Sequence, residues 1–130
     1  MTDDAFSDYL GVIVDKPWGY EYLMFQNELV GVWYLHIRQG ERTSMHCHPR
    51  KKTSLILLEG EGELSFLNDT MKLKPLSRTI IRPGLFHSTQ AFSPKGIAMI
   101  EIETPPDKGN LVRLEDEYGR EKNLMREPNR

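Results

Sequence analysis

Hydrophobic and polar residues alternate along several short segments of the chain, which is the pattern of β-strands with one buried face. In residues 32–38, Trp33, Leu35 and Ile37 share one face, and the residues between them face the other way. Residues 54–58 form a short, almost wholly apolar run, which predicts a strand buried on both faces. Because long segments with helical periodicity are missing from the sequence, the pattern predicts an all-β fold.

Turn residues separate these strands at intervals of about eight to twelve residues. Gly60-Glu61-Gly62 and Asn68-Asp69 predict turns on either side of a strand at 63–67. Further strands are expected at 71–76, 79–81 and 98–102, and a short helical turn is expected within residues 4–10. This spacing is typical of a sandwich or barrel of antiparallel strands.

The size of the chain suits one domain, since it has 130 residues, 38% of them hydrophobic and 28% charged. We expect an N-terminal extension at 1–15, a barrel with its closing segment at 16–120, and a charged tail at 121–130. The formal net charge of −2 argues against nucleic acid or an anionic membrane as a partner. The apolar runs are far shorter than the ~20 residues of a membrane-spanning helix. A cytoplasmic location is expected, because the acidic N-terminus does not resemble a signal peptide and the single cysteine, Cys47, cannot form an internal disulfide.

Three of the four histidines lie in a pattern that suits a metal ion. His46 and His48 are two residues apart, so on a strand both imidazoles point to the same face. Pro83-Gly84 predicts a tight turn that delivers His87 at the start of another strand. Three neutral imidazoles leave an open coordination position on a divalent ion, which a catalytic metal needs. His36 belongs to neither motif and is interpreted as a structural histidine.

These histidines and their neighbours resemble the two sequence motifs of the cupin superfamily over residues 30–103. The matching positions are Gly40, His46, His48, Gly60, Pro83, Gly84 and His87. The resemblance implies a double-stranded β-helix, the cupin jelly-roll barrel of two packed antiparallel sheets. Thr53 stands where the first motif has a glutamate, so the donor set is three neutral histidines. Such a set favours one divalent transition metal, Zn, Fe, Ni or Mn, over Mg²⁺ or Ca²⁺.

The segments at 16–21 and 110–120 are similar to the two ends of the C-terminal cupin domain of type II mannose-6-phosphate isomerases. This resemblance implies a metal-dependent isomerase or epimerase that acts on a phosphorylated or nucleotide-linked sugar, and it implies a homodimer. In that scheme the metal on the three histidines is the electrophile and Glu101 is the catalytic base. The basic residues assigned to substrate binding are Lys52, Arg113 and Arg120. The 130 residues hold no counterpart of the nucleotidyltransferase domain that often precedes this cupin, so guanylyltransferase activity is not implied.

Two other functions stay open at this point. A three-histidine cupin can also be an Fe-dependent dioxygenase, and the barrel can bind carbohydrate without catalysis. Two local alternatives are open as well. The basic run at 50–52 is either a solvated turn or an anion-attracting group at the barrel mouth, and Glu101 faces either the interior or the solvent.

Overall fold

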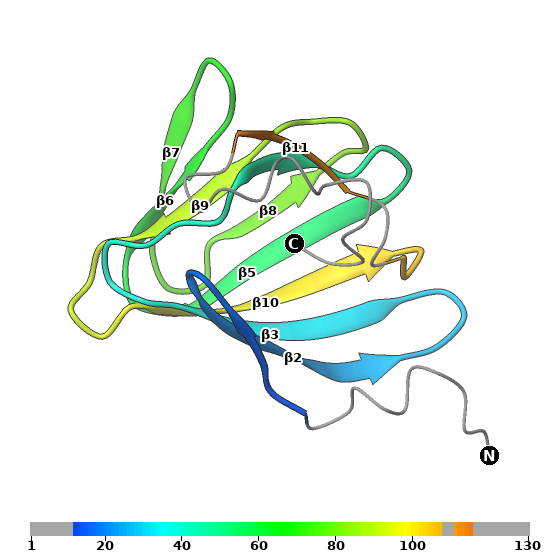
Figure 1. The fold of residues 1–130 in the computed structure, drawn as a ribbon, viewed down its shortest axis with the longest axis horizontal. Helices are drawn as coiled ribbons and strands as arrows, with labels where there is room; N and C mark the ends of the chain where they lie inside the picture. The colour runs from blue at the N-terminus through cyan, green and yellow to red at the C-terminus, as the bar shows by residue number, and fades with distance from the viewer. Residues whose placement is uncertain (1–11, 108–110, 116–130) are drawn as a thin grey trace.

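The computed structural model describes residues 12–107 and 111–115, and within these ranges it contains strands and no helix. The expected helical turn at 4–10 lies outside the described residues. The strands are β1 (Val14–Lys16), β2 (Gly19–Gln26), β3 (Gly31–Ile37), β4 (Met45–Cys47), β5 (Lys52–Glu59), β6 (Gly62–Ser65), β7 (Thr70–Leu73), β8 (Arg78–Ile81), β9 (Ser88–Ala91), β10 (Ile97–Thr104) and β11 (Val112–Glu115) (Figure 1). Within the described ranges, no helix is long and apolar enough to cross a membrane.

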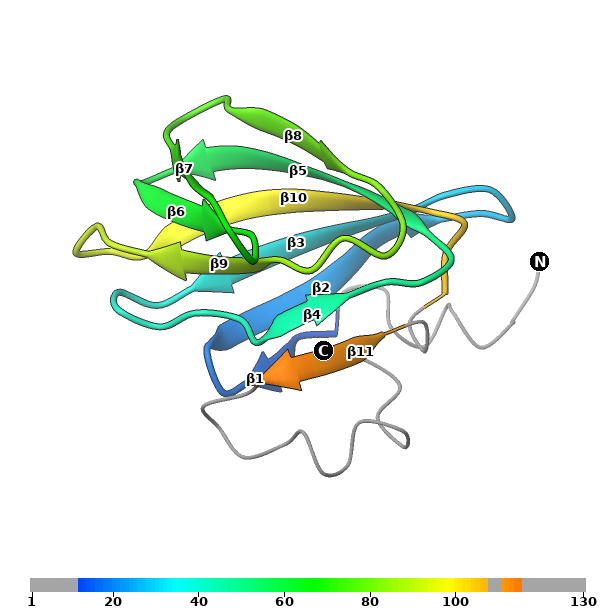
Figure 2. The same cartoon turned by 90° about the horizontal axis from the view of Figure 1, so that it is seen from above.

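The strands form two facing antiparallel layers. The larger layer is a six-stranded sheet in the order β1-β2-β3-β10-β5-β8. The other layer contains the sheets β7-β6-β9 and β11-β4, and backbone bridges from Arg42 to Gln90 and from His46 to His87 join them. Figure 2 shows the resulting order β7, β6, β9, β4, β11 across one face of the larger sheet. The all-β double-stranded β-helix expected from the sequence is confirmed.

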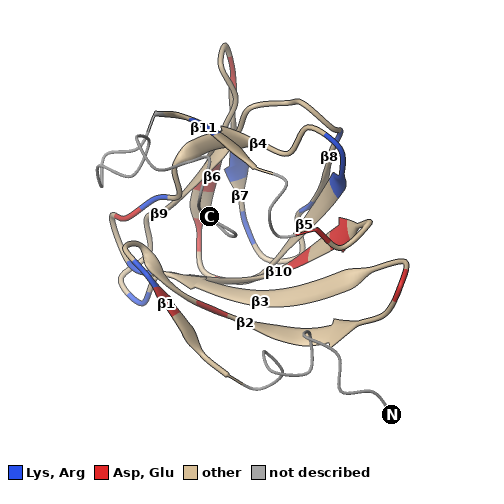
Figure 3. Cartoon of the chain, turned by 45° about the vertical axis from the view of Figure 1, so that its right-hand side comes forward, with Lys and Arg blue, Asp and Glu red and all other residues tan. Residues whose placement is uncertain are grey.

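The hydrophobic core lies between the two layers. On β3, Trp33, Leu35 and Ile37 are buried as the alternation predicts, and this strand carries no charged residue (Figure 3). The remaining members of the core come from both layers and from the first hairpin: Trp18, Leu23, Leu55, Leu57, Leu64, Leu73, Ile81, Ala91, Ile97 and Met99. Burial of these side chains from water is the main force that holds the two layers together.

Two strand predictions were wrong. In β5, Leu55 and Leu57 are buried but Leu58 is 39% exposed, so this strand has one buried face and not two. The reason is that one face of the larger sheet packs on the second layer and the other faces away from it. The strand expected at 71–76 ends at Leu73, and Met71 is exposed on it.

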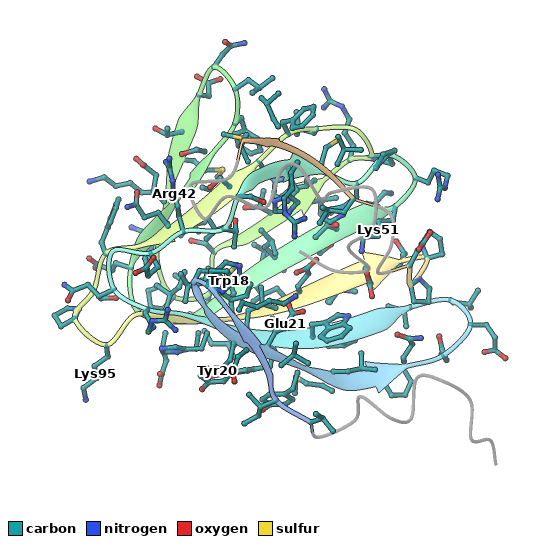
Figure 4. All side chains as sticks on the ribbon, viewed as in Figure 1. Trp18, Tyr20, Glu21, Arg42, Lys51 and Lys95 are labelled. Carbon is teal, nitrogen blue, oxygen red and sulfur yellow. The ribbon has the colours of Figure 1, made fainter. Side chains whose placement is uncertain are left out.

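The segment 16–21 forms the first hairpin, in which β1 pairs with β2. Lys16 and Glu21 form an ion pair with the ammonium nitrogen 3.7 Å from a carboxylate oxygen, and both side chains are buried. Glu21 is labelled in Figure 4. Trp18 lies at the tip of this hairpin and is fully buried in the core. The motif at 16–21 thus closes one side of the barrel.

Aromatic side chains form a row on the outer face of β2 and β3. The ring of Tyr34 stacks on the rings of Tyr22 and Tyr20, with centroids 5.1 and 6.3 Å apart. His36 stacks on Tyr20 at 5.2 Å, on the face opposite to the core, as expected for a structural histidine. Burial, with smaller effects from the Tyr20 and Tyr22 phenols and the Glu59 carboxylate, raises the pKa of Tyr34 above its ordinary value.

Candidate metal centre

The structure brings the three histidines of the sequence motifs together on the inner face of the smaller layer. His46 lies on β4 opposite His87, and the two residues exchange both backbone hydrogen bonds, at 3.0 and 2.8 Å. His48 follows two residues after His46. The ring centroid of His46 lies 4.4 Å from that of His87 and 5.0 Å from that of His48. All three side chains are buried, and one nitrogen of each lies within 4.8 Å of the others.

The Pro83-Gly84 turn holds His87 against the segment that carries His46 and His48. The backbone N–H of Gly84 donates a hydrogen bond to the carbonyl oxygen of His48 at 2.9 Å. Gly84 has φ +82°, a conformation that glycine adopts without the steric penalty of a Cβ atom. The turn predicted from sequence therefore connects the two halves of the site directly.

Backbone carbonyls determine which nitrogen of two imidazoles carries the proton. Nδ1 of His46 lies 2.7 Å from the carbonyl oxygen of Ser44, and Nδ1 of His87 lies 3.0 Å from that of Leu85. A carbonyl oxygen can only accept, so each Nδ1 donates, and the lone pair of the neutral ring is on Nε2. Metal-binding histidines in proteins have this arrangement, since the second hydrogen bond orients the ring.

The donor set therefore fits a divalent transition metal. Zn²⁺ with bonds of about 2.0–2.1 Å to tetrahedral nitrogens needs those nitrogens about 3.4 Å apart. One nitrogen of each of the three imidazoles lies within 4.8 Å of the others. Among the described residues, the group of close ligand atoms contains the three imidazoles and no carboxylate. The three buried histidines can bind a metal ion, and their chemistry favours a borderline metal over Mg²⁺ or Ca²⁺.

Glu101 faces the same cavity as the histidines. It lies on β10 in the opposite layer, its side chain is buried, and it lines a cavity together with His46 and His87. The rest of the lining is mainly apolar: Leu35, Ile37, Thr43, Leu55, Thr89 and Met99. The cavity volume of about 10 Å³ is room for about one water molecule. Of the two orientations left open by the sequence, the structure has the inward one.

The three basic residues assigned to substrate binding lie in different places. Arg113 on β11 is the cross-strand neighbour of His46, and it is buried. Lys52 is the first residue of β5 and is exposed. Arg120 lies outside the described residues. Their roles stay predictions, and the geometry brings Arg113 next to His46.

Sequence reasoning missed a buried ion pair beside the site. Lys51 is 1% exposed, and its ammonium group donates to the carboxylate of Glu103 and, at 3.1 Å, to the carbonyl oxygen of Asp107 (Figure 4). Trp33 Nε1 donates to the second oxygen of the same carboxylate at 2.9 Å. The interpretation of the run 50–52 as a solvated turn is therefore wrong for Lys51. The sequence does contain a signal for this burial. Lys51, just before β5, is an even number of residues from Leu55, so an extended chain points both side chains to the same, buried face.

Cys47 lies between His46 and His48 in sequence and is not a member of the histidine cluster. Its thiol is buried and forms no disulfide, as expected. Burial raises the pKa of the Cys47 thiol above its ordinary value, so the thiol is protonated at neutral pH. Cys47 is therefore a small buried side chain of β4.

Comparison with known proteins identifies the fold. No family model matches the chain. A mannose-1-phosphate guanylyltransferase of Klebsiella pneumoniae is 24% identical over 107 residues, which are 81% of this chain and 23% of that protein. An RmlC-like cupin from Shewanella frigidimarina NCIMB 400 matches with a TM-score of 0.67 and 19% identity, over 80% of this chain and 93% of the other. The capsular polysaccharide assembling protein CapF of Staphylococcus aureus matches with a TM-score of 0.71 and 14% identity, over 80% and 31%. The chain has the cupin fold, and it spans less than a quarter of the length of the curated relative that it matches.

Proposed function

We propose that this protein is a metal-dependent isomerase that moves a proton between adjacent carbons of a phosphorylated or nucleotide-linked sugar. The observation that carries the proposal is the position of Glu101, whose side chain lines the same cavity as His46 and His87 from the opposite layer. Isomerisation of an aldose to a ketose needs a base for the carbon-bound proton and an electrophile for the sugar oxygen. The walls of the cavity offer one group for each role, and the cavity of about 10 Å³ would have to enlarge to admit the sugar.

His46, His48 and His87 would hold the metal, which we propose to be Zn, Fe, Ni or Mn. When bound, it supplies a Lewis acid that polarises a carbonyl or hydroxyl oxygen of the sugar. The ring orientations support this role, because the carbonyls of Ser44 and Leu85 hold two of the imidazoles in place.

Glu101 would take the proton from the carbon next to the carbonyl group and return it to the neighbouring carbon. One carboxylate can serve both positions, since the two carbons lie a single bond apart. Leu55 and Met99 line the cavity with Glu101 and make the surroundings of the carboxylate largely apolar. A buried, positioned base of this kind contributes about 10²–10⁴-fold to the rate.

Arg113 is the proposed contact for the anionic group of the substrate. A guanidinium binds phosphate with two parallel hydrogen bonds, and Arg113 lies in register with His46. Lys52 is exposed at the start of β5, so it would reach the substrate only from the rim of the barrel. Arg120 stays a proposal from the sequence resemblance.

The comparisons support a sugar as the substrate class. One relative is named for transfer to mannose 1-phosphate and one structural neighbour for capsular polysaccharide assembly. A cytoplasmic location and a homodimer stay predictions. The homodimer is tested by light scattering on the purified protein.

The decisive experiment follows deuterium from solvent into the sugar. Protein purified without chelator or a His-tag column is analysed for metals and incubated with mannose 6-phosphate in D₂O, and NMR records exchange at the carbon next to the carbonyl. We expect about one metal ion per chain and exchange that Glu101→Gln lowers by about 10²–10⁴-fold with the metal retained. His87→Ala should lose both metal and exchange. Exchange that is unchanged in Glu101→Gln would refute the assignment of the base.

A dioxygenase is the second candidate, and the donor set without a carboxylate is what favours it. Oxygen uptake by the Fe²⁺-loaded protein, with no exchange in D₂O, would establish this alternative. Sugar binding that persists in the metal-free protein, again with no exchange, would identify a non-catalytic carbohydrate-binding cupin.

A further inference from the structure

We propose that the hydroxyl groups of Thr53 and Thr79 form a subsite that binds ring hydroxyls of the sugar. This inference deepens the proposed function, because it rests on a sugar as the ligand. It concerns the wall of the larger sheet, formed by β5 and β8, and not the histidines on the opposite layer.

The two threonines are neighbours on the inner face of that sheet. Thr53 pairs with Ile81 and Leu55 pairs with Thr79 in the register of β5 and β8. Paired residues of antiparallel strands point to the same face, and Leu55 and Ile81 are both buried in the core. The two threonine side chains therefore lie diagonally opposite each other on the inner face, within about 8 Å.

Their position places them beside the histidine cavity. Leu55 lines that cavity, and it lies two residues from Thr53 and directly opposite Thr79. Glu101 is the neighbour of Leu55 on the other side, in the register of β10 and β5. Neither hydroxyl belongs to the lining of the cavity, so a sugar bound at Glu101 would contact them only where the cavity, about 10 Å³ in this structure, opens toward β8.

Both hydroxyls are buried without a hydrogen bond. Oγ1 of Thr53 and Oγ1 of Thr79 are inaccessible to solvent and have no partner in the part of the chain that the structure describes. Thr53 as a whole is 1% exposed. Thr43, in the same barrel, behaves differently, since its Oγ1 accepts the backbone N–H of Thr89 at 3.0 Å. Because an unbonded buried hydroxyl is unfavourable, two of them side by side indicate a wall built for a partner that is added later.

The chemistry of the wall indicates which partner. A threonine hydroxyl both donates and accepts, as does an alcohol group of a sugar, so each can form a complementary pair. Neither threonine carries the positive charge that a phosphate group needs. The neighbouring cation, Lys51, is already paired with Glu103. The wall therefore fits the neutral, hydroxyl-bearing part of the substrate.

The test measures binding and stability separately from turnover. Affinity for mannose 6-phosphate is measured by calorimetry for Thr53→Val and Thr79→Val, which keep the shape and remove the hydroxyl. Each variant should bind about tenfold more weakly, the loss of one hydrogen bond, while Thr53→Ser keeps its affinity within about threefold. Thr70→Val, on exposed β7, is the control that should bind as the wild type does. Without sugar, the melting temperatures of both valine variants should equal or exceed that of the wild type.

Deoxy sugars identify the group that is bound. One monodeoxy analogue lacks the sugar hydroxyl that Thr53 binds. The wild type and Thr53→Val should bind this analogue with equal affinity. Unchanged affinity in both valine variants, or a wild type that does not bind the sugar, would overturn the subsite. So would melting temperatures that fall by several degrees without ligand, since the hydroxyls would then be bonded within the protein. A wild type that binds the sugar and shows no proton exchange would refute the isomerase and leave the subsite standing.

Discussion

Replacing Lys51 with methionine should destabilise the protein strongly, because it leaves a carboxylate buried without its cation. Lys51 and Glu103 are 1% and 0% exposed, and their charged groups are in direct contact. Removing one partner of such a pair costs about 3–5 kcal/mol. With an unfolding entropy of about 2.1 cal/mol/K per residue, a chain of 130 residues should melt about 10–20 °C lower. Methionine nearly matches the length of the lysine chain, so the charge is the main change.

Urea unfolding followed by circular dichroism measures this free energy by linear extrapolation. The matched control is Lys52→Met, one residue along the chain. Lys52 is exposed, so its replacement should change the free energy of unfolding by less than about 0.5 kcal/mol.

A double variant separates the ion pair from simple loss of packing. Glu103→Gln keeps an acceptor for the N–H of Trp33 and removes the negative charge. Combined with Lys51→Met it should be less destabilising than the sum of the two single changes by more than about 1 kcal/mol. The reasoning would be refuted by a loss below about 1 kcal/mol in Lys51→Met, or by an equal loss in Lys52→Met.

Three further predictions follow from the structure. Since the pKa of Tyr34 is raised, the unfolded state releases this proton first, and stability should fall as the pH rises above about 10; Tyr34→Phe should reduce that fall in unfolding experiments from pH 8 to 11. Gly96→Ala should lower the free energy of unfolding by more than about 2 kcal/mol, because at φ +77° the added Cβ would lie 2.3 Å from the carbonyl oxygen of Ile37. Gly40 has a similar φ of +80° but open space around it, so Gly40→Ala should cost only about 1 kcal/mol. Cys47 should react with a thiol reagent at pH 8 at least about tenfold more slowly in the folded than in the urea-unfolded protein, because burial keeps the thiol protonated.

Each of these predictions has a result that contradicts it. Identical alkaline profiles for the wild type and Tyr34→Phe would show that this phenol does not contribute to alkaline unfolding. Equal losses in the two glycine variants would show that backbone conformation, and not the contact with Ile37, determines the cost. A Cys47 that reacts equally fast in both states would show that the thiol is accessible.

Much of the fold and of the candidate site could be predicted from local sequence patterns. The two-residue period of a strand places Trp33, Leu35 and Ile37 on one face whatever the rest of the chain does. The same period puts His46 and His48 on a common face, and Pro83-Gly84 predicts the turn before His87. These inferences hold because each depends on residues close together in the chain.

Other features depend on which strands become neighbours, and this is decided by packing of the whole chain. Glu101 reaches the histidine cavity because β10, which begins at Ile97, pairs between β3 and β5, which end far earlier in the chain, at Ile37 and Glu59. The apolar run at 54–58 has one exposed face because the larger sheet packs against a single layer. Lys51 is buried, and Lys52 is not, because Glu103 lies opposite Thr53 across the same sheet. Pairing of strands that are far apart in the chain brings such charges together. The local alternation of residues carries no information about which strands pair.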